Sequence, residues 1–125
     1  YMGFSTAKPW LPIGEAHRPR AVVRQEADQA SLLHWTRQVL ALRNASPALR
    51  SGTMTFHDLP GDLLAFTRSH ADQQMLCIFN LGDQPAHWTP DDADHWRPLL
   101  TCGDAAPWHF PPASALVAQF QGSVS

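Results

Sequence analysis

Hydrophobic residues divide the chain into three stretches that differ in periodicity. The first stretch, residues 1–27, carries bulky apolar side chains such as Phe4, Trp10 and Ile13 but follows neither a helical nor a strand period. Loops of this length are uncommon in compact domains, and disordered segments rarely contain so many large apolar residues. We therefore expect an irregular lead segment that packs against something outside the chain.

The second stretch predicts an amphipathic helix over about residues 29–45. Asp28 or Ser31 is a suitable N-cap, and Arg43 is favourable near the C-terminus. The helix should end near residue 45 because Pro47 disfavours helical backbone at the residue before it, with one further turn over 47–50. Apolar residues recur on one face at helical spacing: Leu32, Trp35, Val39 and Leu42, widened by Leu33 and Leu40.

The third stretch, from residue 52 to 125, has the character of β structure. Turn-rich segments at 58–62, 69–73 and 82–85 and an acidic loop at 90–95 separate its apolar runs. The run at 75–81 is apolar on both faces and is predicted to be a central strand. Short strands at this spacing favour an antiparallel sandwich. Strands are expected at 53–57, 63–68, 75–81, 87–88, 97–101, 108–110 and 115–120.

Overall composition and charge are those of an ordinary globular protein, with 44% hydrophobic and 16% charged residues and a net charge of −2. No apolar run approaches the roughly 18–20 residues that cross a membrane, so no membrane partner is predicted. Arg18, Arg20 and Arg24 form a basic strip, but no aromatic or glycine pattern of a nucleic-acid module accompanies it. We interpret these arginines as partners of carboxylates and predict no nucleic-acid binding.

Two cysteines, Cys77 and Cys102, are too few for a disulfide framework. Cys77 lies in the most apolar run, where cysteine usually behaves as a small buried hydrophobic residue. A reducing, cytoplasmic location is the prediction that follows.

Carboxylates and histidines provide no recognisable catalytic or metal motif. A glycosidase-type pair needs two rigidly held carboxyl groups, one with a raised pKa. The aspartates of this chain fall instead in predicted turns, at a predicted helix cap and in a polar loop. The histidines show no metal-ligand spacing, and the Asp91–His95 region lacks the glycine and distal glutamate of a calcium loop. We expect no catalytic, substrate-binding or metal residue and no cofactor. The residues concerned are Glu15, Glu26, Asp28, Asp58, Asp62, Asp72, Asp83, Asp91, Asp92, Asp94 and Asp104, with His17, His34, His57, His70, His87, His95 and His109.

Five tryptophans are the remaining candidates for a binding surface. Trp35 belongs to the predicted core face of the helix and Trp10 to the lead segment. Trp88, Trp96 and Trp108 could form an aromatic platform for sugar rings. The alternative, that they belong to the sheet core or to a contact with a neighbouring domain, is favoured.

Several spaced motifs resemble, in order, the α-glucosidases of the α-amylase superfamily (family 13 glycoside hydrolases). The first 52 residues carry the most specific matches; Ala21 and Gln29 depart from the family's usual Asn and Pro. The matching segments are 3–13 (GFSTAKPWLPI), 22–25 (VVRQ), 28–33 (DQASLL), 41–43 (ALR), 46–52 (SPALRSG), 64–68 (LAFTR), 76–81 (LCIFNL) and 112–117 (PASALV).

This resemblance implies a mixed α+β fragment, namely the end of a (β/α)8 barrel followed by the C-terminal β-sandwich. Residues 1–51 would be the end of the catalytic barrel, with the helix at about 29–45 as its last helix, and residues 52–125 the sandwich. The family's aspartate nucleophile and glutamate acid/base, which act in a retaining mechanism, would lie upstream and are absent here. The implied partners are the rest of the barrel and the carbohydrate substrate of the parent enzyme.

The resulting interpretation is a structural C-terminal segment of an α-glucosidase acting on α-linked gluco-oligosaccharides, which is not catalytic by itself. Two alternatives remain open. One is a free-standing carbohydrate-binding module. The other is the tail of a related glucosyltransferase or sucrose isomerase, which would share the same motifs.

Overall fold

The computed structural model describes residues 2–3 and 5–122. Tyr1 and Phe4, which belong to the predicted lead segment, lie outside the described residues. The chain divides into two compact units, residues 1–42 and 43–125, which are considered separately.

The first unit contains a 3-10 turn at Glu15–His17, helix α1 at Val22–Ala27, and most of helix α2, Leu32–Ala45. The Gln25 side chain organises the start of α2: its Oε1 accepts from the Leu33 N–H at 3.0 Å, and its Nε2 donates to the Arg20 carbonyl at 2.6 Å. The Ser31 hydroxyl donates to the Gln25 carbonyl at 2.7 Å and accepts from the His34 N–H at 3.4 Å. Ser31 is therefore the N-cap, one of the two residues predicted for this role.

Two expectations for this unit need correction. The lead segment is not irregular throughout, because it contains α1 and the 3-10 turn. Helix α2 begins at Leu32 rather than near 29, since Asp28 Oδ1 accepts from the Ala30 N–H at 3.0 Å and closes a local turn instead of capping the helix. Trp35 is half-buried, whereas Leu32 on the same predicted face is 71% exposed.

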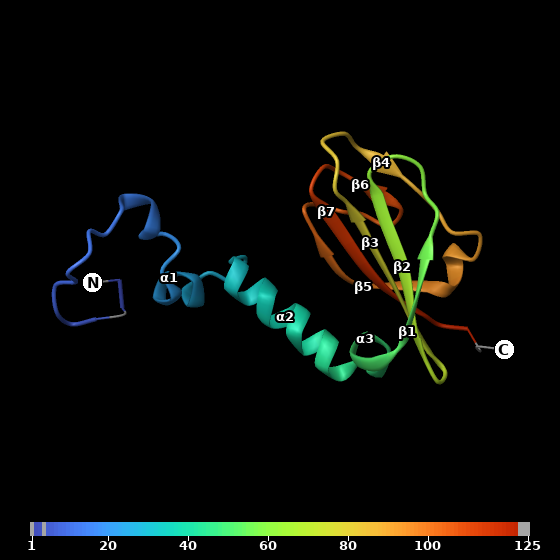
Figure 1. Ribbon diagram of the computed structural model, residues 1–125, viewed down its shortest axis with the longest axis horizontal. Coiled ribbons are helices and arrows are strands. Elements are labelled where there is room, and N and C mark those ends of the chain that lie inside the picture. Colours follow the sequence, from blue (N-terminus) through green and yellow to red (C-terminus); the bar gives the residue numbers. More distant parts are fainter. Residues whose placement is uncertain (1, 4, 123–125) are drawn as a thin grey trace. The chain divides into compact units, whose positions relative to one another are not determined.

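The second unit contains the last residues of α2, the one-turn helix α3 and then β structure (Figure 1). Five strands form an antiparallel sheet in the order β1-β2-β3-β7-β5, and β4 pairs with β6 in a second, two-stranded sheet. The predicted central strand, β3, is in the middle of the large sheet. The elements are α3 Pro47–Ser51, β1 Thr53–His57, β2 Leu63–His70, β3 Gln73–Asn80, β4 Ala86–His87, a 3-10 turn Ala93–His95, β5 Trp96–Cys102, β6 His109–Phe110 and β7 Ser114–Phe120.

All the expected strands are found; β1 has the expected bounds, and the bounds of the other strands differ from the expectation by one or two residues. The turn expected at 69–73 shrinks to two residues, with Ala71 at a φ of 50°, because β2 and β3 extend to His70 and Gln73. Leu81 lies beyond β3 and is 70% exposed. The acidic loop at 90–95 contains a 3-10 turn.

Alternation along the strands gives the large sheet two different faces. Its inner face carries the main hydrophobic cluster, against which Phe110 of β6 packs fully buried. The half-buried Trp88 and Trp108 pack against the same cluster. The small sheet thus covers the inner face and forms the second layer of a sandwich. The cluster on the large sheet consists of Leu63, Ala65, Leu76, Ile78, Trp96, Leu116 and Ala118.

Asn80 at the end of β3 joins the two layers. Its side chain is 2% exposed, and its Nδ2 lies 2.8, 2.9 and 3.1 Å from the carbonyl oxygens of Gln84, Phe110 and Pro111. Its Oδ1 accepts from the Gly82 N–H at 3.0 Å. One buried amide therefore satisfies backbone groups of β6 and of the turn before β4.

In the described part of the chain, no helix has both the length and the apolar character that crossing a membrane requires.

Candidate functional site

The acidic residues are not arranged as a catalytic pair. All eleven carboxylates named above are on exposed residues, so none has the buried environment that keeps a general acid protonated near neutral pH. Among the described residues, no three histidine, cysteine, aspartate or glutamate side chains gather closely enough to hold a metal ion.

The three tryptophans considered as a sugar platform have different environments. Trp96 is 9% exposed, packs edge-to-face on Phe120 with ring centroids 5.1 Å apart, and donates from Nε1 to Asp92 Oδ1 at 2.9 Å. Trp108 is half-buried against the core. Trp96 is thus a core residue, as the favoured alternative predicts, and the proposed three-ring platform is not formed.

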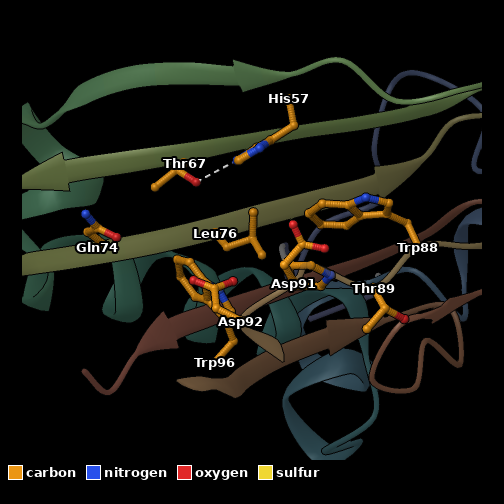
Figure 2. A pocket seen from close by; sticks show the side chains of 10 residues that line it. His57, Thr67, Gln74, Leu76, Trp88, Thr89, Asp91, Asp92 and Trp96 are labelled. Carbon is orange, nitrogen blue, oxygen red and sulfur yellow. Dashed lines mark hydrogen bonds between the residues drawn. The ribbon is translucent and has the colours of Figure 1, made fainter. Parts of the chain in front are cut away.

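Trp88 lines a cavity of about 530 Å³ on the inner-face side of the large sheet. Figure 2 shows Trp88, Asp91 and Asp92 among the side chains that line it, together with Thr67 of β2 and Gln74 of β3. The fully buried Leu76 forms an apolar part of the lining. The remaining lining residues are His57, Thr67, Gln74, Thr89, Pro90, Asp92 and Trp96.

Hydrogen bonds fix part of this lining. His57 Nε2 and Thr67 Oγ1 are 2.7 Å apart, and the His57 ring lies 5.7 Å from the Trp88 ring. The Trp96 indole holds Asp92 in place. The cavity therefore combines an aromatic surface with hydroxyl, amide, imidazole and carboxylate groups, which suits recognition of a small polar ligand.

The second candidate site is the outer face of the large sheet. Phe56, Phe66 and Phe79 form a row across β1, β2 and β3: the first two rings meet edge-to-face at 5.9 Å and the last two stack at 6.0 Å. Phe56 is 64% exposed and Met54 beside it 46%. We call this surface the apolar outer face; it comprises Met54, Phe56, Leu64, Phe66, Phe79 and Val117.

Helix α3 covers only one end of the outer face of the large sheet. It contacts β2 and β3, where Met75 is fully buried. The Arg68 guanidinium donates to the Gly52 carbonyl at 2.8 Å, and the Ala48 N–H donates to Gln73 Oε1 at 3.0 Å. The phenylalanine row lies beyond this cover, and exposed apolar patches of this kind typically mark an interaction surface.

Cys77 lies on the outer side of β3 and is 5% exposed. Burial raises the pKa of its thiol to about 11, although the nearby Arg68 charge acts in the opposite direction. Both cysteines are free, and Cys77 is the buried hydrophobic residue that the sequence predicts.

The sequence named Trp88 and Trp96, which both line the cavity, as candidate binding residues, but it predicted neither the cavity itself nor the apolar outer face. The strands at 53–57, 63–70 and 73–80 contribute one phenylalanine each to the row, and only the strand pairing shows that the three lie on the same face. The cavity has no local signal, because His57, Thr67 and Trp88 come from separate strands and a loop.

No protein-family model matches the chain. Two curated proteins are similar to it: a probable alpha-glucosidase of Rhizobium meliloti (strain 1021), 51% identical over 84 residues, and a probable oligo-1,6-glucosidase 3 of Bacillus subtilis (strain 168), 32% identical over 88 residues. These alignments include 67% and 69% of the chain but only 15% and 16% of the two relatives. The chain thus spans about a sixth of the length of the curated relatives it matches.

Solved structures with a similar fold include an alpha-glucosyl transfer enzyme, with a TM-score of 0.75 and 34% identity. They also include a trehalulose synthase of Pseudomonas mesoacidophila MX-45, with a TM-score of 0.77 and 25% identity. In both cases the match covers 94% of the chain and 23% of the solved chain. The antiparallel sheet corresponds to the C-terminal β-sandwich region of such α-amylase-family enzymes.

Proposed function

Because the chain is homologous to part of the α-glucosidases and shares its fold with enzymes of the α-amylase family, we propose that it is the C-terminal portion of an α-glucosidase. The parent enzyme would be a retaining glycoside hydrolase acting on α-linked gluco-oligosaccharides. The observation that carries the proposal is the 51% identity to a probable alpha-glucosidase over 84 residues.

The role of this portion is structural. The catalytic carboxylates belong to the upstream barrel, consistent with the exposure of every carboxylate-bearing residue here. The apolar outer face supplies a surface for packing against the barrel, because a row of aromatic rings is costly to leave in water. The barrel is therefore the proposed partner, and the isolated chain does not hydrolyse glycosides.

Within this proposal, residues 1–51 are the end of the barrel, α2 is its last helix and residues 52–125 are the C-terminal domain. The exposed Trp10, Leu11 and Leu32 would be covered by the barrel. Two free cysteines are compatible with a cytoplasmic location.

One alternative differs only in the reaction of the parent. The transfer enzyme and the trehalulose synthase share the fold at 34% and 25% identity. The higher identity to the probable alpha-glucosidase favours a hydrolase. A carbohydrate-binding module built on three tryptophans is less well supported, because Trp96 is buried.

A chimaera tests the proposal. The segment of the Rhizobium meliloti relative that aligns with this chain is replaced by the corresponding residues of this chain, and hydrolysis of p-nitrophenyl α-glucoside is measured. We expect the chimaera to retain activity and Phe56→Ser in it to lower its melting temperature. Thr55→Ser, the neighbouring position on the other side of β1, is the matched control. An inactive, unfolded chimaera would count against the proposal.

A further inference from the structure

The cavity beside Trp88 lies on the side of the large sheet opposite the apolar outer face. His57, Thr67, Gln74 and Leu76 pair or alternate with the inner-face residues Ala65 and Ile78, whereas the phenylalanine row occupies the intervening positions. A partner that covers the outer face therefore leaves the cavity accessible. Its function can be separate from the structural role of the sheet.

Trp88 gives the cavity an apolar wall that is held in place. The indole packs against the core on one side and lies 5.7 Å from the His57 ring, which is itself bonded to Thr67. An aromatic ring presented in this way can stack against the C–H face of a flat ring ligand with little loss of side-chain entropy.

The polar lining contains both donors and acceptors. Asp91 makes no hydrogen bond or ion pair with any described residue, and it lines the same cavity as Trp88 (Figure 2). Asp92 is oriented by the Trp96 indole, and Gln74 and Thr67 add an amide and a hydroxyl from neighbouring strands. Carboxylates alone would suit a cation, but a cation has no use for the N–H and O–H donors of the strand side chains.

We propose that this cavity binds a neutral pyranose ring, which stacks on Trp88 and places hydroxyl groups on Asp91, Asp92 and the polar side chains of β2 and β3. The volume of about 530 Å³ is within the roughly 300–1,000 Å³ of small-molecule sites. The inference goes beyond the proposed function, because it gives the sandwich a sugar site of its own that requires no catalytic domain.

The test is a titration of the full 125-residue chain with maltose, followed by two-dimensional 1H–15N NMR. Maltose at millimolar concentration should shift the Trp88 indole N–H and the amides of residues 89–92. Asp91→Asn should weaken binding about tenfold, or about 1.4 kcal/mol, because it removes the charge from a hydrogen-bond acceptor for a sugar hydroxyl. Asp94→Asn, which removes the same charge from an exposed residue outside the cavity, should leave binding unchanged.

Trp88→Leu provides a second arm, with its fold checked from the same spectra, and should abolish the maltose-dependent shifts. Three results would overturn the proposal: no shifts at any maltose concentration, equal weakening by Asp91→Asn and Asp94→Asn, or shifts produced by tetramethylammonium but not by maltose. None of them bears on the chimaera, so failure of this inference is distinguishable from failure of the proposed function.

Discussion

Replacing Asn80 by alanine removes the side chain that joins the two layers of the sandwich. The amide nitrogen has two hydrogens for three carbonyl oxygens at 2.8–3.1 Å, so two full bonds can form at once. The amide oxygen accepts a third bond, from the Gly82 N–H. At about 1 kcal/mol net for each bond, Asn80→Ala should lower the free energy of unfolding by about 3 kcal/mol.

A loss of this size lowers the melting temperature by roughly 12–24 °C, at about 4–8 °C per kcal/mol for a domain of this length. Circular dichroism during heating and urea denaturation measure it. Asn44→Ala, at an exposed position in α2, is the matched control and should change stability by less than about 0.5 kcal/mol. A loss below about 1 kcal/mol for Asn80→Ala would refute the reasoning that this amide holds the layers together.

Asn80→Asp tests the same contacts through the pH dependence of the folding stability. The introduced carboxylate would face three carbonyl oxygens in a buried site, which raises its pKa in the folded state above the unfolded value of about 3.9. The folded state then binds more protons than the unfolded state, so stability falls as the pH rises through and above about 4. A variant equally stable at pH 3.5 and pH 7, relative to the parent chain, would contradict this.

Three further predictions concern the core, the thiols and the α3–β1 junction. Phe110→Ala, at a fully buried position, should cost about 3–5 kcal/mol in urea denaturation, whereas Phe56→Ala, 64% exposed, should cost less than about 1 kcal/mol; equal losses would contradict the assignment of the two faces. In the native chain at pH 8, Ellman's reagent should modify the half-buried Cys102 and spare Cys77, whose pKa burial raises to about 11, and both should react in urea; equal native rates would be the opposing result. A methyl group at Gly52 would lie 2.5 and 2.7 Å from the carbonyl oxygens of Ala48 and Ser69, so Gly52→Ala should cost about 1–3 kcal/mol in thermal denaturation, and an unchanged melting temperature would show that this packing is not required.

Local patterns were sufficient to predict most of the β structure. The strand at 53–57 has the predicted bounds, and β3, apolar on both faces, is central. Asp58 and Gly61 mark the turn between β1 and β2 because turn residues act through their own backbone preferences. Features that depend on residues adjacent in the sequence could therefore be predicted from composition and alternation.

Helix α1 could not be predicted in this way, and local patterns left open whether Asp28 or Ser31 caps α2. Val22–Ala27 is too short to show a helical period, and its N-cap residue Ala21 makes no side-chain bond. The position at which α2 begins depends on Gln25, eight residues before the Leu33 N–H that it accepts from. No capping rule based on adjacent residues includes such a contact.

The cavity was also beyond local reasoning. Trp88 and Trp96 are the same residue type and both line the cavity, yet Trp88 is half-buried whereas Trp96 is 9% exposed with its indole bonded to Asp92. Only the pairing of strands brings Thr67 and Gln74 to the same opening. The resemblance to α-glucosidases supplied the family, but it carried no information about this surface.

Hydrolysis of p-nitrophenyl α-glucoside, measured in parallel for the isolated chain and for the chimaera, tests the central claim most directly. We expect no turnover by the isolated chain, because its carboxylate residues are all exposed, and clear turnover by the chimaera. Turnover by the isolated chain that persists after repeated purification would contradict it.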